Sequence, residues 1–208
     1  MKYRLALFDV DSTLIEQEVI DLLAKRTPYA DRVSDITRRA MAGELDFDSA
    51  LQERVSLLRD LPESVFDEVL NEISFSPGAL ELVSFLKEQG AVVGAVSGGF
   101  LNVLERLFEN LPLDYLKANS LEVADGVLTG RTLGPIINRR AKAEALAQFA
   151  GFFGVPISET IAIGDGSNDI DMVSLAGLGV SYRGKDILNS AADIVITDKG
   201  LDALITFL

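Results

Sequence analysis

Two aspartates, Asp9 and Asp11, stand two residues apart directly after the apolar run Leu5–Phe8. At the end of a buried strand, two carboxylates are costly unless a metal cation or a shared proton compensates them. One carboxylate can act as a nucleophile and the other as a general acid. The pair therefore suggests phosphoryl-transfer chemistry.

Two other strings could hold an anion. Ser97, Gly98 and Gly99 offer a hydroxyl and closely approaching amides at an expected helix start. Lys142, at the start of a helical pattern in RRAKAEAL, adds a positive charge. Both features suit phosphate oxygens.

A second acidic group lies in the string GDGSNDIDM, after another apolar run. Asp165, Asn168 and Asp169 can supply the oxygen ligands that a hard cation prefers. Because open α/β sheets bind ligands at the carboxyl ends of their strands, we expect Asp9, Ser97 and Asp165 to meet at one edge.

Each string also has an ordinary structural interpretation. DVDST alone is as often a turn and helix N-cap, SGG a loop before a helix, and GDGSND a turn with Asx hydrogen bonds. Lys142, Glu18 and Arg54 alone would be exposed helix charges, and Met41 and Phe47 ordinary core residues. The combination of four strings in one order, each at a strand end or helix start, favours an active site.

The elements that position these residues alternate between short β-like runs and helical patterns. This pattern predicts an α/β fold with a doubly wound, Rossmann-like parallel sheet covered by helices on both faces. The predicted strands are Tyr3 to Phe8, Ala91 to Val96, Tyr115 to Ala118, Thr160 to Ile163, Leu178 to Ser181 and Ile194 to Thr197. Residues 121–133 alternate around an Asp-Gly pair and predict a hairpin.

One long segment shows helical periodicity only. Residues 14–75 predict an inserted helical cap, and residues 1–13 and 76–208 the core domain. The expected cap helices are Val19 to Ala24, Val33 to Met41, Phe47 to Leu58 and Val65 to Ile73. The cap carries seven basic and fourteen acidic side chains, and the rest of the chain twelve and eighteen. Neither part has a broad basic surface.

Composition excludes several kinds of function. The 208 residues are 48% hydrophobic and 25% charged, as in globular proteins. With no Cys and no His, the chain has no disulfides, thiolate catalysis or histidine metal sites. A net charge of −13 argues against nucleic acid and anionic membranes as partners. With no signal peptide or membrane span in the sequence, we expect a cytoplasmic protein.

The strings together resemble the haloacid dehalogenase-like (HAD-like) phosphatases. DVDST, SGGF, AKAE and GDGSND are similar to the four motifs of that superfamily. EVIDLLA and ITRRAMAGELDFDSALQERVSLL resemble the cap of its phosphoserine phosphatase family, and PGALELVSFLK continues the likeness. The resemblance covers nearly the whole chain. Because no extra N-terminal domain precedes the first motif, we expect the amino-acid-binding regulatory domain that some relatives carry to be absent.

The resemblance implies roles for particular residues. Asp9 would be the nucleophile that forms an aspartyl-phosphate, and Asp11 the general acid and then base. Mg²⁺ would be held by Asp9, the Asp11 carbonyl and Asp165. Asn168 and Asp169 would support the metal ligands, and Asn168 would also be a substrate-binding residue. The phosphate would be bound by Ser97, Gly98, Gly99 and Lys142. Glu18 would bind the substrate ammonium group and Arg54 its carboxylate, while Met41 and Phe47 would shield the site from water.

The implied reaction is hydrolysis of O-phospho-L-serine, the last step of serine biosynthesis. The alternatives are another small phosphomonoester, such as phosphohomoserine or a phosphorylated amino alcohol, and a receiver-type domain that accepts phosphate without being an enzyme. A receiver has no use for the long helical insertion. The sequence leaves the oligomeric state open.

Overall fold

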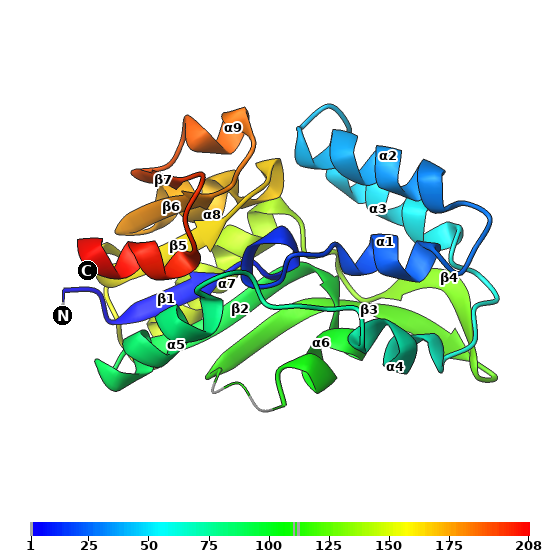
Figure 1. Ribbon diagram of the computed structural model, residues 1–208, viewed down its shortest axis with the longest axis horizontal. Coiled ribbons are helices and arrows are strands. Elements are labelled where there is room, and N and C mark those ends of the chain that lie inside the picture. The colour runs from blue at the N-terminus through cyan, green and yellow to red at the C-terminus, as the bar shows by residue number, and fades with distance from the viewer. Residues whose placement is uncertain (1, 110, 112) are drawn as a thin grey trace.

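A computed structural model describes residues 2–109, 111 and 113–208, and it centres on a seven-stranded sheet of order β4-β3-β2-β1-β5-β6-β7 (Figure 1). The strands are β1 (Leu5–Phe8), β2 (Val92–Phe100), β3 (Tyr115–Ala124), β4 (Val127–Leu133), β5 (Thr160–Gly164), β6 (Leu178–Tyr182) and β7 (Ile194–Ile196). Neighbouring strands run parallel except β3 and β4, which form an antiparallel hairpin. The predicted α/β class is confirmed.

The central strand β1 is buried on both faces. Ala6 and Phe8 pack into one apolar cluster, while Leu5 and Leu7 pack into another. This continuous apolar run is what a parallel strand covered on both sides requires. The first cluster includes residues of α5 (Ala79–Glu88) and α6 (Leu101–Leu107), and the second includes residues of α7 (Arg139–Phe153), α8 (Ile170–Leu175) and α9 (Asp186–Asn189).

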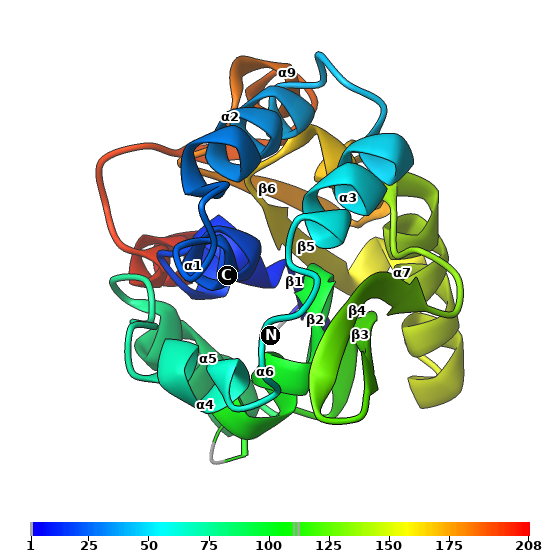
Figure 2. The same cartoon turned by 90° about the vertical axis from the view of Figure 1, so that its right-hand side faces the viewer.

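Four helices lie between β1 and β2 in the chain: α1 (Val19–Ala24), α2 (Ala30–Met41), α3 (Phe47–Ser56) and α4 (Val65–Leu70). Helices α2 and α3 pack on each other beyond the carboxyl end of β1, and they share a small apolar cluster of their own (Figures 1 and 2). Helices α1 and α4 contribute to the first of the two clusters, the one that contains Ala6 and Phe8. The division into a core and a cap of residues 14–75 stays a prediction.

One predicted boundary is wrong at a place that matters. Strand β2 does not end at Val96 but continues to Phe100, with a register shift against β3 between the two. Ser97, Gly98 and Gly99 therefore lie in the last part of a strand, and α6 starts only at Leu101. Glycines tolerate such irregular strand ends, because no side chain has to fit the ladder.

Smaller differences concern helix ends and turns. Helices α3 and α4 end at Ser56 and Leu70, earlier than the periodicity predicts, because the following apolar residues lie in turns that still face the core. The predicted hairpin is confirmed, with Asp125 and Gly126 in the left-handed conformation at its turn. Among the described residues, no helix has both the length and the apolar character needed to cross a bilayer.

Candidate active site

Asp9 and Asp11 lie at the carboxyl end of β1, where the chain enters a five-residue irregular turn, η1 (Val10–Leu14). Asp11 is held on both oxygens: Oδ1 accepts a hydrogen bond from the Val19 amide and Oδ2 from Ser97 Oγ, both at 3.0 Å. Burial raises the pKa of Asp11, although these two donors oppose the shift. A fixed carboxyl group with a raised pKa suits a general acid.

Lys142 joins the first and last acidic strings. Its ammonium group is completely buried and lies 2.6 Å from both Asp9 Oδ1 and Asp169 Oδ1. Burial alone would lower the pKa of Lys142, but the charges of Asp169 and Asp9 outweigh it and raise the pKa. Lys142 is therefore a fixed positive charge beside Asp9. The ordinary interpretation of Lys142 as an exposed helix charge is wrong, because its side chain is buried.

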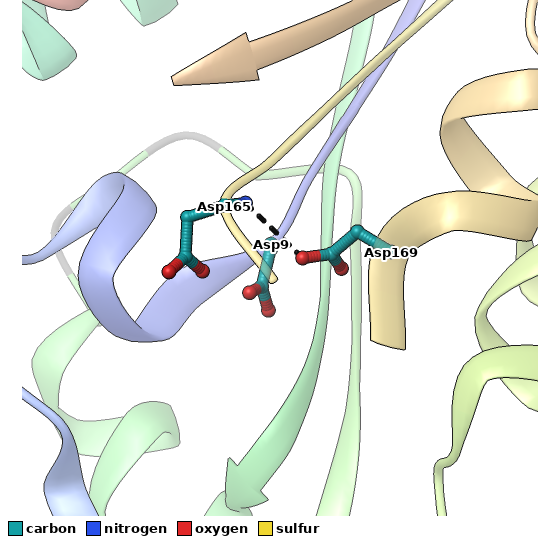
Figure 3. A group of neighbouring side chains, drawn as sticks. All are labelled: Asp9, Asp165 and Asp169. Carbon is teal, nitrogen blue, oxygen red and sulfur yellow. Dashed lines mark hydrogen bonds between the residues drawn. The ribbon is translucent and has the colours of Figure 1, made fainter. Parts of the chain in front are cut away.

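Three carboxylates meet at this point, although they come from different parts of the chain. Asp9, Asp165 and Asp169 each offer one oxygen such that all three oxygens lie within 4.8 Å of one another (Figure 3). Burial raises the pKa of Asp9 well above its usual range, and the Asp169 carboxylate raises it further. Burial likewise raises the pKa of Asp165, with added repulsion from Glu18 and Asp9. Among the described residues, these three carboxylates share one cationic partner, Lys142.

The hydrogen bonds distinguish the members of this cluster. Asp169 uses Oδ1 for Lys142, and Oδ2 accepts from the amides of Asp165 and Gly166 at 3.1 and 3.0 Å. Asp165 Oδ1 and Asn168 Oδ1 are buried and have no hydrogen-bond partner among the described residues. Asp9 and Asp165 thus fit a divalent cation, which would bind the free oxygen and relieve the repulsion, whereas Asp169 orients its neighbours.

A narrow pocket opens from this cluster toward α2 and α3. Its volume is about 20 Å³, which is room for little more than one water molecule. The lining residues are Asp9, Asp11, Glu18, Ile20, Met41, Phe47, Leu51, Arg54, Gly98, Gly99 and Asn168. All four residues expected to come from the cap, Glu18, Met41, Phe47 and Arg54, are among them.

Phe47 and Arg54, both on α3, reach this pocket in different ways. Phe47 lies so close to Gly98 that a Cβ there would be 2.8 Å from the ring, so glycine is what allows the contact. Arg54 is 2% exposed, and its guanidinium donates to the Ala50 carbonyl and to Thr37 Oγ1. Among the described residues no carboxylate forms an ion pair with it. A buried, unpaired guanidinium in a pocket is suited to bind an anion.

Glu18 supplies the opposite charge at the same pocket. Its Oε1 accepts a hydrogen bond from Ser12 Oγ at 2.7 Å. Burial, followed by repulsion from Asp11, raises the pKa of Glu18 to about 7. A cationic ligand group beside Glu18 would lower this pKa and keep the carboxylate charged. The pocket therefore combines a site for an anion with a site for a cation.

Three residues that support the site were not predicted from the sequence. Ser12, in the left-handed conformation, orients Glu18, and Thr37 links Arg54 to Asp21. Asn119 donates to the Gly98 carbonyl at 2.8 Å and accepts from the Ile137 amide at 2.8 Å. Only Ser12 carries a signal in the sequence, because it lies inside the DVDST string.

Comparisons with known proteins agree with this arrangement. The family model described as haloacid dehalogenase-like hydrolase matches residues 6–174. The chain is 46% identical over 205 residues to the protein named phosphoserine phosphatase SerB2 from Mycobacterium tuberculosis, covering 99% of this chain but half of that relative. It is 46% identical to a phosphoserine phosphatase from Streptococcus thermophilus, covering 98% of this chain and 95% of that protein.

A solved structure is similar along the whole chain. It is described as a phospho-aspartyl intermediate analogue of phosphoserine phosphatase, and it superimposes with a TM-score of 0.96 at 41% identity, covering all of both chains. Both the fold and the family model therefore lead to one conclusion. This chain belongs to the haloacid dehalogenase-like hydrolases.

Proposed function

We propose that the protein hydrolyses O-phospho-L-serine to L-serine and phosphate through an aspartyl-phosphate on Asp9. The names of the relatives support the substrate, and the pocket supports it independently. Arg54 is the observation that carries the proposal, because its buried guanidinium lines the pocket, forms no ion pair among the described residues and is suited to bind an anionic group of the substrate other than the phosphate. The carboxylate of an amino acid is such an anion, and Glu18 matches its ammonium group.

In the first step, a carboxylate oxygen of Asp9 attacks phosphorus and the bond from phosphorus to the serine oxygen breaks. The leaving alkoxide is strongly basic, so it takes a proton from Asp11. In the second step, the Asp11 carboxylate takes a proton from water, the water oxygen attacks phosphorus, and the bond to Asp9 breaks. The Val19 amide, which donates to Asp11 Oδ1, keeps the carboxyl group directed at the reacting atoms throughout.

The phosphate needs fixed donors as well as a nucleophile. We propose that Lys142, Ser97 and the amides of Gly98 and Gly99 bind its oxygens, with Asn168 at the pocket wall. In the structure the Gly99 amide donates to Ser97 Oγ at 2.7 Å, so Ser97 and Gly99 already form one hydrogen-bonded unit. Phosphate binding would exchange that internal contact for contacts with the ligand.

The cation of the proposal is Mg²⁺, held by Asp9, Asp165 and the Asp11 carbonyl, with Asn168 and Asp169 supporting them. When bound, it would neutralise charge on the phosphoryl oxygens and reduce the repulsion between the phosphate and Asp9. The free oxygen of Asp165 and the raised pKa values of Asp9 and Asp165 support a cation at this place. The cytoplasmic location expected from the sequence stays a prediction.

The substrate assignment is tested by removing either Arg54 from the protein or the carboxylate from the substrate. Arg54→Ala should lower kcat/KM for O-phospho-L-serine by roughly 30-fold to several thousandfold, as for loss of a buried charge partner. Phosphoethanolamine has no carboxylate, so the same variant should hydrolyse it nearly as fast as the wild type. Glu18→Gln is the matched control, since it should weaken the hydrolysis of both amines.

An equal loss for both substrates in Arg54→Ala would contradict the assignment. Arg54 would then be a structural residue or a phosphate ligand, and the protein a phosphatase of another small monoester, such as phosphohomoserine. Circular dichroism and thermal unfolding of the variant would exclude a folding defect as the cause.

A further inference from the structure

The structure shows a closed pocket, so substrate cannot enter without movement. A volume of about 20 Å³ lies far below the several hundred Å³ of ordinary ligand pockets. Met41 of α2 also lies against the loop after β5, where a Cβ on Gly166 would be 3.0 Å from its sulfur. Helices α2 and α3 must therefore move away from the sheet for substrate to enter and for product to leave.

Among the described residues, two side-chain hydrogen bonds connect α2 and α3 with the sheet side of the pocket. Ser167 Oγ donates to the Ala40 carbonyl at 2.9 Å, and Asn138 Nδ2 donates to Asp48 Oδ2 at 3.0 Å. Both donors line a groove of about 410 Å³ beside the pocket, and Asp48 lines it from the α3 side. The second bond joins two side chains, so both partners can be exchanged.

Asn138 has a second task at the same time. It is the N-cap of α7, and its Oδ1 accepts a hydrogen bond from the Ala141 amide at 3.1 Å. The Lys142 amide donates to the Asn138 carbonyl one turn later. The residue that starts the helix of the phosphate-binding lysine is thus the residue that holds α3.

We propose that Asn138 and Asp48 form a latch that stabilises the closed pocket, and that Asn138 is a positioning residue for the reaction. The latch requires the amide. An aspartate would cap α7 at least as well, since a carboxylate is favoured at a helix N-terminus, but it would place a second negative charge against Asp48. Capping and latching can therefore be separated by a single substitution.

The first test uses Asn138→Asp, and then a second substitution that should compensate for it. The single substitution should raise KM for O-phospho-L-serine by about 5-fold to 30-fold, which lies within the range of coupling between contacting residues. The effect should fall on KM, because saturating substrate still closes the pocket, and kcat should change by less than about twofold. Misplacement of Lys142 would instead lower kcat.

The double variant Asn138→Asp with Asp48→Asn provides the rescue. The amide introduced at position 48 would donate to the carboxylate at position 138, so the same bond forms with donor and acceptor exchanged, and KM should return to within about threefold of the wild type. Gln148→Glu adds the same charge to an exposed position of α7 and is the control for charge alone. Thermal unfolding should show that α7 stays capped in every variant.

The kinetic test rests on the proposed function, so a second measurement is needed that does not. The chain has no Cys, so nitroxide labels on Ser34→Cys in α2 and Gln148→Cys in α7 would be the only labels. In buffer with Mg²⁺, electron–electron double resonance should show one population of label-to-label distances in the labelled protein that keeps Asn138 and Asp48. Asn138→Asp should add a second population, and the double variant should remove it.

Two results would overturn the latch: distance distributions that do not change among the three proteins, or a loss in kcat that the double variant does not rescue. If the distances shift as expected but O-phospho-L-serine is not hydrolysed by any of the proteins, the latch stands and the proposed substrate is wrong.

Discussion

Several charged side chains of this protein are buried without the partners that would make burial inexpensive. Among the described residues Arg54 forms no ion pair and Asp165 Oδ1 has no donor, and the partly buried Glu18 is repelled by another acid, Asp11. Each arrangement costs stability when the protein is alone. The proposed ligands, a zwitterionic phosphate ester and a divalent cation, supply the missing partners.

Glu18 gives this cost a pH dependence. Its pKa is raised from 4.5 to about 7, so the folded protein binds more protons than the unfolded chain between these values, and stability falls as pH rises through this window. Glu18→Gln removes the titration. In chelator, the variant should gain about 1 to 3 kcal/mol over the wild type at pH 8 and much less at pH 5.

Urea unfolding at the two pH values measures this difference. Glu105→Gln makes the same change at an exposed position of α6 and is the matched control, which should change stability by less than about 0.5 kcal/mol. A gain for Glu18→Gln that is the same at pH 5 and pH 8 would show that Glu18 does not titrate in this range.

At the scale of secondary structure elements, the site depends on strand ends that are tied to one another. Asn119 of β3 connects the carbonyl of Gly98 in β2 with the amide of Ile137, just before α7. It thereby fixes the position of the proposed phosphate donors relative to Lys142. Strand, loop and helix are held by one amide side chain that does not line the pocket.

Replacing Asn119 should therefore affect both stability and activity. Asn119→Ala leaves a partly buried carbonyl and a buried amide without these partners, which should cost about 1 to 3 kcal/mol. The kcat should fall at least tenfold because Ser97 and Lys142 are no longer aligned. Asn102→Ala removes a similar pair of bonds, to Leu121, away from the pocket.

The comparison between the two variants is the test. Asn102→Ala should lower stability by a similar amount and leave kcat nearly unchanged at a temperature where both proteins are folded. If both variants lost activity in proportion to stability, Asn119 would have no specific part in positioning the site.

The elements were predictable to different degrees, for physical reasons. β1, β5 and the helix of Lys142 could be predicted because apolar runs and turn residues mark them, and Asp9, Asp165 and Lys142 follow from their places beside them. The extension of β2 through Ser97 could not, because pairing with β3 overrides the turn signal of two glycines. The burial of Arg54 depends on how α2 and α3 pack together, which no local pattern reports.

The whole molecule is strongly acidic, with a net charge of −13, yet it is proposed to bind an anionic substrate. The positive charges that matter, Lys142 and Arg54, are almost completely buried at the pocket rather than spread over the surface. A bound cation would add to them. Binding of the cation should therefore contribute to the stability of the entire fold, because the acidic cluster joins the ends of β1 and β5.

Mg²⁺ should raise the melting temperature of the wild type by about 5 to 10 °C when its concentration is 100 times the dissociation constant. Asp165→Asn removes one repelling charge, so it should melt at a higher temperature than the wild type in chelator and gain almost nothing from Mg²⁺. Asp171→Asn, beyond the cluster and paired with Arg139, is the control and should keep the full response. Calorimetry would contradict the proposed site if Asp165→Asn responded to Mg²⁺ like the wild type.

The most direct test of the account is to capture the covalent intermediate. Wild-type protein mixed with O-phospho-L-serine carrying a radioactive phosphoryl group and Mg²⁺, then quenched in acid within milliseconds, should retain label on a single peptide that contains Asp9. Because an acyl phosphate is expected, base or hydroxylamine should release the label, and Asp9→Asn should show neither label nor turnover. Phosphoserine hydrolysis by wild-type protein without any label on Asp9, or by Asp9→Asn checked for deamidation, would contradict it.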